Sequence, residues 1–321
     1  MAFSIRREMF TGNISDAGAK EIFSDSVQRV DLEVFTYCNR TCWHCGNATI
    51  DRRSKNEFME AAVYERILDD LAAIDYDKTL SFHRYNEPLA DRVILDRLRQ
   101  AKARLPKATL VANTNGDYLN PAYLAELAEA GLGALRVQAY LGAGKTFDDL
   151  QVLTAMTRRL AALGLPFEFV RATPGTAYMA KVDVPGMEVL VQSFNFGTIG
   201  IDRGKVVEGV CRVTRDMPCD HPFMTFNIDW NGAVMPCCHL RSDVPEHKDY
   251  IVGRIGPDTS IFDLFVNGPL RFWRSQLLTY GAKRAPCDTC AEFPLWFRAE
   301  HAQDLERAAQ CFGLKGDSGD A

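Results

Sequence analysis

Short apolar runs alternate with amphipathic segments along the first 195 residues of the chain. Runs rich in branched apolar residues, typical of strands, lie at 30–36, 78–83, 108–112, 134–139, 166–170 and 187–193. Between them, apolar residues at helical spacing predict helices at 58–74, 89–105, 121–130 and 145–163. This alternation predicts a parallel α/β sheet with right-handed crossovers, whose ligands bind at the carboxyl ends of the strands.

The alternation stops near residue 196, where a glycine-rich loop leads on to Met217. Beyond the loop, apolar runs at 224–229 and 233–237 flank Asn231-Gly232, which is a strong hairpin signal. We therefore expect four regions, which are a lead-in with one helix at 1–29, an α/β domain at 30–195, a linker loop and small domain at 196–296, and a C-terminal helix with a disordered tail at 297–321.

Composition narrows the class of protein. The 321 residues are 47% hydrophobic and 25% charged, as in a globular protein with one large and one small domain. The net charge of −5 without a long basic run argues against nucleic acid as a partner. No signal peptide or membrane span is evident, so we expect a cytoplasmic protein, in which ten cysteines indicate metal or redox chemistry rather than disulfides.

The first cysteine group follows the first predicted strand directly. Cys38, Cys42 and Cys45 have the spacing C-x3-C-x2-C. Three thiolates on one short loop can hold three irons of a [4Fe–4S] cubane and leave the fourth iron open, because a fully ligated cluster takes four cysteines. A zinc site completed by His44 is the alternative, but His44 adjoins Cys45 and neighbouring residues rarely close a tetrahedron.

This cysteine loop, placed after a first strand, resembles that of the radical S-adenosylmethionine (SAM) superfamily. The resemblance implies a partial (β/α)6 barrel, an open iron that chelates SAM, and a 5′-deoxyadenosyl radical that abstracts hydrogen from substrate. It also implies an external electron donor such as flavodoxin or ferredoxin.

The resemblance further marks positions that would contact SAM. Tyr85-Asn86-Glu87 stands where the family has a Gly-Gly-Glu-like motif, although both glycines are absent here. Without the resemblance, Tyr85-Asn86-Glu87 is interpreted as the start of a helix, Thr114-Asn115-Gly116 as a turn, and Tyr140 as a core residue. The SAM contacts implied by the resemblance are His44, Tyr85, Asn86, Glu87, Asn115, Gln138 and Tyr140.

A second cysteine group lies in the last third of the chain. Cys219, Gly232 and Cys237 form C-x12-G-x4-C, and Cys287 and Cys290 form a later C-x2-C. Two cysteine pairs also describe a zinc ribbon. The pattern resembles the twitch domain, a shortened SPASM domain built from a hairpin and a helix, and this resemblance implies one auxiliary [4Fe–4S] cluster held by these four cysteines.

Three cysteines remain outside the two groups. Cys238 would point away from its neighbour Cys237, and we expect Cys238 and Cys311 to be packed residues. Cys211 lies in the glycine-rich loop, which we expect to cross the barrel mouth, and is the candidate hydrogen donor. Candidate substrate contacts are His83, Arg84, Arg171, Asn195, Asp202 and Arg203.

The resemblance leaves several reactions open. The favoured hypothesis is a radical SAM epimerase that inverts a carbinol centre of a sugar, aminocyclitol, or aminoglycoside or nucleoside antibiotic precursor, with a Cys211 thiol returning the hydrogen. The alternative is a dehydrogenase or diol dehydratase acting on a similar substrate. A peptide-modifying enzyme is a third hypothesis, against which the short lead-in and single auxiliary cluster argue. A non-catalytic iron–sulfur or zinc protein is the hypothesis from another class.

Overall fold

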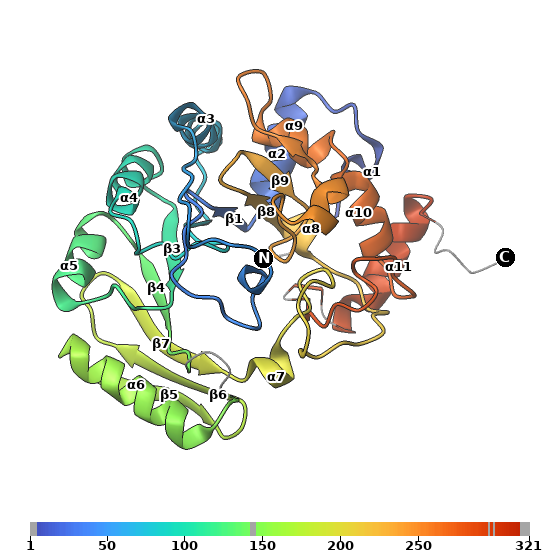
Figure 1. The fold of residues 1–321 in the computed structure, drawn as a ribbon. Helices are drawn as coiled ribbons and strands as arrows, with labels where there is room; N and C mark the ends of the chain where they lie inside the picture. Colours follow the sequence, from blue (N-terminus) through green and yellow to red (C-terminus); the bar gives the residue numbers. More distant parts are fainter. Residues whose placement is uncertain (1–4, 142–145, 295, 298, 315–321) are drawn as a thin grey trace.

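The computed structural model describes residues 5–141, 146–294, 296–297 and 299–314, and a ten-stranded sheet runs through its centre (Figure 1). The strand order is β10-β9-β8-β1-β2-β3-β4-β7-β6-β5. The strands are β1 (Arg29–Leu32), β2 (Thr79–Ser81), β3 (Thr109–Thr114), β4 (Ala134–Gln138), β5 (Phe167–Thr173), β6 (Ala177–Val182), β7 (Glu188–Phe194), β8 (Thr225–Ile228), β9 (Ala233–Met235) and β10 (Gly253–Arg254). The run from β8 to β7 is parallel, which confirms the predicted fold class, and antiparallel strands form both edges.

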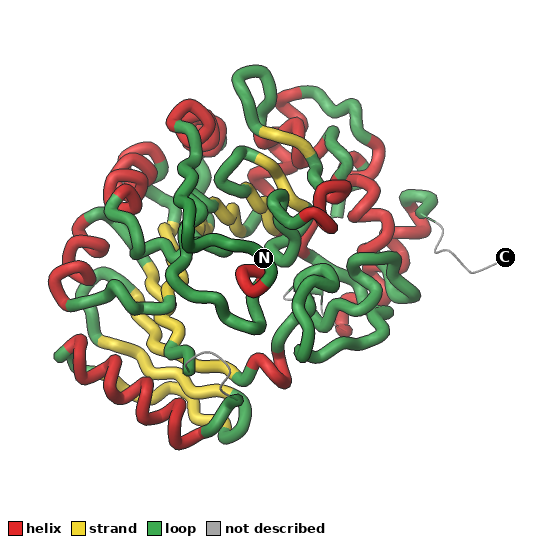
Figure 2. Tube along the Cα trace, in the orientation of Figure 1, coloured by secondary structure: helices red, strands yellow, loops and turns green. Residues whose placement is uncertain are grey.

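Helices cover the outer face of the parallel strands, while long loops gather over the strand ends near the centre of the molecule (Figure 2). The α-helices are α1 (Glu8–Thr11), α2 (Asp16–Ser26), α3 (Ala61–Ala72), α4 (Val93–Arg104), α5 (Pro121–Glu129), α6 (Asp149–Leu163), α7 (Phe196–Ile199), α8 (His221–Met224), α9 (Ile261–Val266), α10 (Leu270–Leu277) and α11 (Ala302–Cys311). Short 3₁₀ turns lie at η1 (Gly46–Ala48), η2 (Pro245–Tyr250) and η3 (Ala299–His301). None of the described helices is long and apolar enough to cross a membrane.

The predicted fifth strand occupies an unexpected place. It is β5, which pairs antiparallel with β6 at the sheet edge, while β7 takes the parallel position beside β4. The turn between β5 and β6 contains Pro174-Gly175, and Gly175 has a φ of +71°. Proline followed by glycine between two apolar runs is a turn signal, so this segment is a hairpin and contributes no further strand–helix unit.

The small domain shares the sheet of the barrel. The hairpin predicted at Asn231-Gly232 is present as β8 and β9, and Gly232 has a φ of +75°. Strand β8 also pairs in parallel with β1, from Arg29 opposite Thr225 to Leu32 opposite Ile228. The segment with Cys237 therefore lies next to the loop of the first cysteine group, although about two hundred residues separate them in sequence.

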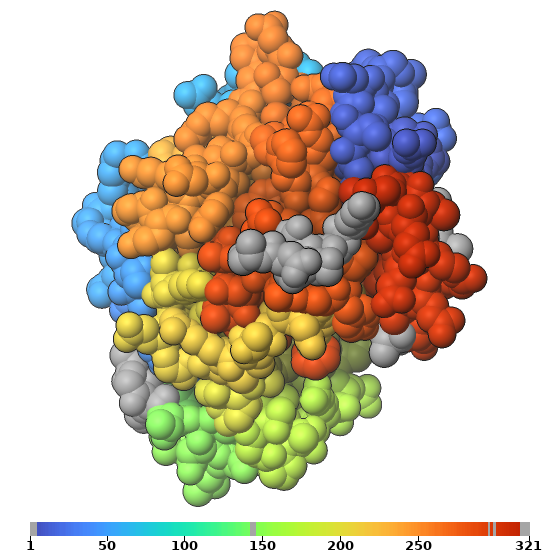
Figure 3. All heavy atoms as spheres, turned by 90° about the vertical axis from the view of Figure 1, so that its right-hand side faces the viewer, coloured from blue at the N-terminus to red at the C-terminus, as the bar shows by residue number. Residues whose placement is uncertain are grey.

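The N-terminal segment packs against the C-terminal part of the chain. The Phe23 ring of α2 makes edge contacts with Phe226, Phe262 and Phe265, at centroid distances of 5.2–5.5 Å. The Phe10 ring lies 5.5 Å from that of Phe312, and Figure 3 shows these terminal segments side by side. Cys311 was expected in the core but is exposed on α11. Of the tail predicted to be disordered, residues 315–321 lie outside the described residues.

Candidate active site

A central cavity of about 390 Å³ lies at the carboxyl ends of β1 to β4 and β7. All three cysteines of the first group line it, together with the Tyr85-Asn86-Glu87 turn that follows β2. All seven residues predicted to contact SAM line this cavity. The structure therefore brings together the two motifs that sequence analysis paired.

The first cysteine loop is held by backbone hydrogen bonds. The Cys38 amide donates to the Arg52 carbonyl at 3.1 Å, and the Cys45 amide donates to the Cys42 carbonyl at 2.9 Å. Burial, reinforced by the two neighbouring thiols, raises the pKa of Cys42 to about 12, and burial raises that of Cys38 to about 11. Thiols with pKa values this high ionise at neutral pH only beside a bound cation, so this donor set fits a metal cluster.

Glu87 organises the turns around the cavity rather than reaching across it. Its carboxylate accepts hydrogen bonds from the Leu89 amide at 3.0 Å, the Asn115 amide at 2.6 Å and the Thr114 hydroxyl. Burial raises the pKa of Glu87 to about 7 despite these donors. The carboxylate therefore joins its own turn to the Thr114-Asn115-Gly116 turn after β3, where Gly116 has a φ of +71°.

Several buried polar atoms in the lining have no partner among the described residues. They are Nδ2 of Asn86, Oε1 of Gln138, Nδ1 of His44, Nη1 of Arg84 and Nε of Arg203. Buried polar atoms without a partner are costly. This lining is consequently suited to a polar ligand that offers both donors and acceptors.

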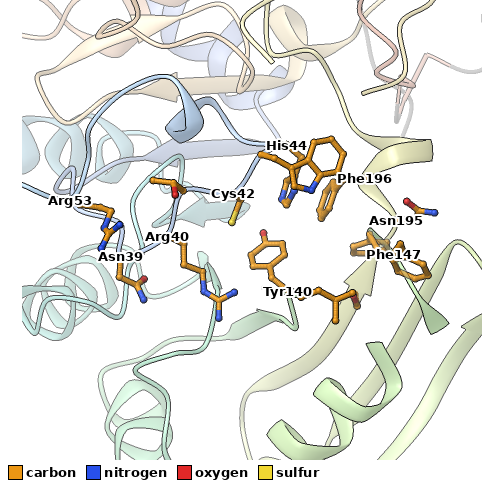
Figure 4. A pocket seen from close by; sticks show the side chains of 14 residues that line it. Asn39, Arg40, Cys42, His44, Arg53, Tyr140, Phe147, Asn195 and Phe196 are labelled. Atoms are coloured by element: carbon orange, nitrogen blue, oxygen red, sulfur yellow. The ribbon is translucent and has the colours of Figure 1, made fainter. Parts of the chain in front are cut away.

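A second, outer cavity of about 320 Å³ adjoins the central one and has aromatic walls. The His44 ring stacks on Phe196 at a centroid distance of 3.8 Å and an angle of 7°, and Tyr140 lies 5.3 Å from His44 (Figure 4). Burial lowers the pKa of His44 to about 4, so the ring is neutral and stacks as an aromatic residue at neutral pH. These rings line both cavities and thus form the wall that the two share.

The second cysteine group lines a separate small cavity. Cys219, Cys237, Cys287 and Cys290 all face it. Arg215 is buried beside them and donates four hydrogen bonds to the carbonyls of Met217, Pro218, Cys290 and Glu292, at 2.5–3.2 Å. Four buried thiols gathered around one space, next to a buried cation, fit a fully ligated iron–sulfur cluster.

A hydrogen-bonded network joins the central and four-cysteine cavities, and sequence analysis missed it. Arg203 donates to Nδ1 of His239 at 2.7 Å, and Nε2 of His239 lies 3.0 Å from Glu292. The Cys238 thiol lies 3.8–3.9 Å from the same ring. Ligand atoms of His221, Cys238 and His239 lie within 4.8 Å of one another, but both His239 nitrogens already have partners, so a hydrogen-bonded network describes the group better than a metal site. The run Cys237-Cys238-His239 in the sequence is the signal that could have found it.

The predicted substrate contacts divide into two sets. His83, Arg84 and Arg203 line the central cavity, and Asn195 lines the outer one, where its side chain caps α7. Arg171 does not line either cavity, because β5 is an exposed edge strand. Asp202 is also outside them, since its buried carboxylate turns toward Thr289 and accepts its hydroxyl at 2.6 Å.

The two spare cysteines of this region are placed differently from expectation. Cys211 is half-buried and is not among the described residues that line the central, outer or four-cysteine cavities. Cys238 lines the central cavity, while the adjacent Cys237 lines the four-cysteine cavity. The expected opposite orientation of these neighbours is present, but it directs Cys238 to the central cavity rather than into the core.

Comparisons with known proteins match both halves of the chain. The radical SAM superfamily matches residues 32–161, and an iron–sulfur cluster-binding domain, SPASM, matches residues 219–291. These two domains imply SAM and [4Fe–4S] clusters as cofactors. A curated protein of Niallia circulans, S-adenosyl-L-methionine-dependent 2-deoxy-scyllo-inosamine dehydrogenase, is 33% identical over 118 residues, which are 37% of this chain and 47% of the relative. The chain thus spans about half the length of the curated relative that it matches.

Solved structures of BtrN are similar in fold. BtrN in complex with AdoMet and 2-DOIA is 22% identical, with a TM-score of 0.57 over 78% of this chain and 87% of BtrN. BtrN in an open conformation is 21% identical, with a TM-score of 0.51 over 78% of this chain and 85% of BtrN. At this level of identity the likeness is one of fold.

Proposed function

We propose that the chain is a dehydrogenase of a hydroxylated small molecule, because residues 32–161 match the radical SAM superfamily and residues 219–291 match an iron–sulfur cluster-binding SPASM domain. The reaction converts a secondary alcohol of a cyclitol-like or sugar-like substrate to a ketone. The matched relative is named as a dehydrogenase of an aminocyclitol, which favours this reaction over the epimerisation that sequence analysis preferred.

The observation that carries the proposal is the wall between the two cysteine-lined cavities. Cys237 and Cys238 are adjacent in sequence, and one faces the four-cysteine cavity while the other faces the central cavity. A substrate in the central cavity is therefore separated from the second cluster site by little more than this dipeptide. That short separation suits the transfer of an electron from substrate to an auxiliary cluster.

We assign the cluster ligands as the cysteine spacing predicts. Cys38, Cys42 and Cys45 hold the SAM-binding cluster, and the auxiliary cluster is held by Cys219, Cys237, Cys287 and Cys290. When bound, the first cluster with SAM supplies the radical that takes a hydrogen atom, and the second supplies an electron acceptor. A flavodoxin or ferredoxin is the reductant we propose for the first cluster.

Oxidation of the alcohol removes one hydrogen atom, one electron and one proton from the substrate. The carbinol carbon loses its hydrogen atom, the resulting substrate radical loses one electron, and the hydroxyl group loses its proton as the C=O bond forms. Asp31 lines the central cavity and pairs with Arg29 at 3.1 Å. Burial acts to raise the pKa of Asp31, but Arg29, His83, Arg84 and the hydrogen bond from Ser81 together outweigh it, and the pKa is lowered. The ionised Asp31 carboxylate is the acceptor that we assign to the hydroxyl proton.

Epimerisation is the second candidate because a free thiol lines the central cavity. The Cys238 thiol could return a hydrogen atom to the opposite face of a substrate radical. Cys211, the donor expected from the sequence, has less support because it lines none of the described cavities. A diol dehydratase is the remaining variant, and it would release water from the substrate.

Turnover of an aminocyclitol in deuterated water distinguishes the candidates. The reconstituted enzyme is incubated anaerobically with reductant, SAM and 2-deoxy-scyllo-inosamine, the compound in the name of the relative. A dehydrogenase yields a product that has lost two hydrogens, with no solvent deuterium on the oxidised carbon. A product of unchanged composition with one deuterium on an inverted carbon contradicts the proposal, and loss of that product in Cys238→Ala but not in Cys211→Ala would identify the donor of an epimerase.

A further inference from the structure

Tyr85 departs most clearly from the motif that the cysteine loop led us to expect, because a large side chain stands in place of a glycine. The side chain does not fill the cavity. It is 4% exposed, and its ring lies 4.2 Å below the Arg241 guanidinium, with Arg203 at 5.9 Å. Its hydroxyl donates a hydrogen bond that is shared between the carbonyl oxygens of Cys238 at 3.1 Å and His239 at 3.0 Å.

The backbone of Tyr85 is tied to the opposite side. Its amide donates to Oε1 of Glu33 at 3.1 Å, and its carbonyl accepts from Nδ2 of Asn47 at 2.7 Å. Asn47 lies two residues after Cys45, in the turn that ends the first cysteine loop. Oδ1 of the same Asn47 accepts from Nη1 of Arg241 at 2.7 Å, which closes a ring of contacts around Tyr85.

We propose that Tyr85 locks the SAM-binding turn onto the auxiliary-cluster loop, so that SAM affinity depends on whether the auxiliary cluster is assembled. The two carbonyls that accept the Tyr85 proton belong to the residues directly after Cys237. A metal-bound Cys237 holds this loop in place. Without the cluster the loop is free to relax, and the buried hydroxyl loses its acceptors. The cost of an unpaired buried hydroxyl then falls on the Tyr85-Asn86-Glu87 turn.

The expected change in SAM affinity follows from the strength of the Tyr85 hydrogen bond. A buried hydrogen bond of this kind corresponds to roughly a two- to tenfold change in an equilibrium constant. Coupling between binding sites is reciprocal, so bound SAM must favour retention of the auxiliary cluster by the same factor. This inference concerns binding alone and holds whichever reaction the enzyme catalyses.

A double-mutant cycle measures the coupling directly. The SAM dissociation constant is determined from the change that SAM causes in the electron paramagnetic resonance signal of the first cluster. Four proteins are compared, namely the parent, Cys287→Ala/Cys290→Ala, Tyr85→Phe, and the combination. We expect loss of the auxiliary cluster to weaken SAM binding about two- to tenfold in the parent and to have no effect in the Tyr85→Phe background. An equal loss in both backgrounds, or no loss in the parent, overturns the proposal.

Tyr64→Phe is the matched control. Tyr64 is also fully buried, and its hydroxyl donates to the Arg97 carbonyl at 2.6 Å, but it lies on α3 outside the cavities. It should lose stability as Tyr85→Phe does while keeping the full dependence of SAM affinity on the auxiliary cluster. If Tyr64→Phe abolishes that dependence as well, the effect is one of general stability and the proposal fails.

A second measurement tests the coupling without cysteine substitutions. The iron that the auxiliary cluster retains at equilibrium with a chelator is measured with and without saturating SAM. Bound SAM should raise the chelator concentration needed for half-removal about two- to tenfold in the parent protein and leave it unchanged in Tyr85→Phe. Equal protection in both proteins overturns the proposal.

Discussion

At the scale of single residues, the charge of Glu87 controls the hydrogen bonds that hold the Tyr85-Asn86-Glu87 turn, which we propose to bind SAM. Three donors, from Leu89, Thr114 and Asn115, point at its carboxylate, and each requires an acceptor. Protonation converts one carboxylate oxygen into a donor, which leaves at least one of these groups without a good acceptor. Since the pKa of Glu87 is raised to about 7 by burial, this change in protonation falls near neutral pH.

We therefore expect SAM affinity to fall as the pH is lowered through about 7, by up to about tenfold for each pH unit below the pKa. In Glu87→Gln the affinity should be low and nearly independent of pH, because the amide already carries a donor. Iron content should be unchanged, since Glu87 is not a cysteine-loop residue. Titration of SAM binding by the two proteins checks this, with Glu65→Gln on the exposed face of α3 as control. A wild-type affinity that rises as the pH falls would contradict it.

At the scale of elements, Arg215 holds together the two segments that carry the auxiliary cysteines. Its guanidinium bonds the carbonyls of Met217 and Pro218, just before Cys219, and those of Cys290 and Glu292. This side chain adds to the two backbone hydrogen bonds that join the same segments, from the Val213 amide to the Thr289 carbonyl at 3.4 Å and from the Arg215 amide to the Asp288 carbonyl at 2.8 Å. The planar fork of arginine can serve four carbonyls at once, which a lysine ammonium with three donors cannot.

We expect Arg215→Met to lose auxiliary iron during purification, because four carbonyls lose their donors and the loops separate. Iron in the first cluster should be retained, so the total should fall from about eight toward about four per chain. Arg215→Lys should lose less, and Arg99→Met, an exposed residue of α4, should keep the full complement. Iron analysis and absorbance of the purified proteins provide the measurement. Full iron content in Arg215→Met would show that the loops do not need this side chain.

Some elements could be predicted from the sequence and others could not. Local sequence signals were sufficient to predict β1, the hairpin at Gly232 and the helices of the barrel, because each of these depends on periodicity or on a turn residue. The antiparallel pairing of β5 with β6 was missed because the Pro174-Gly175 turn was not recognised. The pairing of β8 with β1 has no local signal, since the partner of a strand is decided by packing.

The lack of a local signal for packing partners also explains which residues of the candidate site were predicted correctly and which were not. Cysteine spacing found the lining of both cysteine-lined cavities, because ligands of one cluster must lie close together in space. It could not place Arg171 or Asp202, whose positions depend on an edge hairpin and on a contact with Thr289. Nor could it find the contact between Tyr85 and the Cys238 and His239 carbonyls, which joins residues about 150 positions apart.

At the scale of the whole molecule, the barrel and the auxiliary domain form one folding unit. Strand β8 continues the sheet beyond β1, and Phe23 of the lead-in packs on Phe226, Phe262 and Phe265 of the C-terminal part. Residues on both sides of the expected boundary at 196 therefore share one sheet and one core. Interdomain motion at this boundary would have to break strand pairing.

A chain truncated after residue 200 consequently should not fold, although it would retain β1 to β7, the first cysteine loop and the Glu87 turn. Truncation bares the hydrogen-bonding edge of β1 and removes three aromatic partners of Phe23. Loss of such packing costs on the order of 3–5 kcal/mol for a single large aromatic residue, whereas a whole domain is stable by about 5–15 kcal/mol. Near-ultraviolet circular dichroism of the truncated protein should show no fixed aromatic environment, and the protein should aggregate through the open strand edge.

The full-length Cys287→Ala/Cys290→Ala protein separates loss of chain from loss of cluster, and it should keep a cooperative unfolding transition. A soluble truncated chain that unfolds cooperatively and binds about four irons would instead establish the barrel as an independent domain.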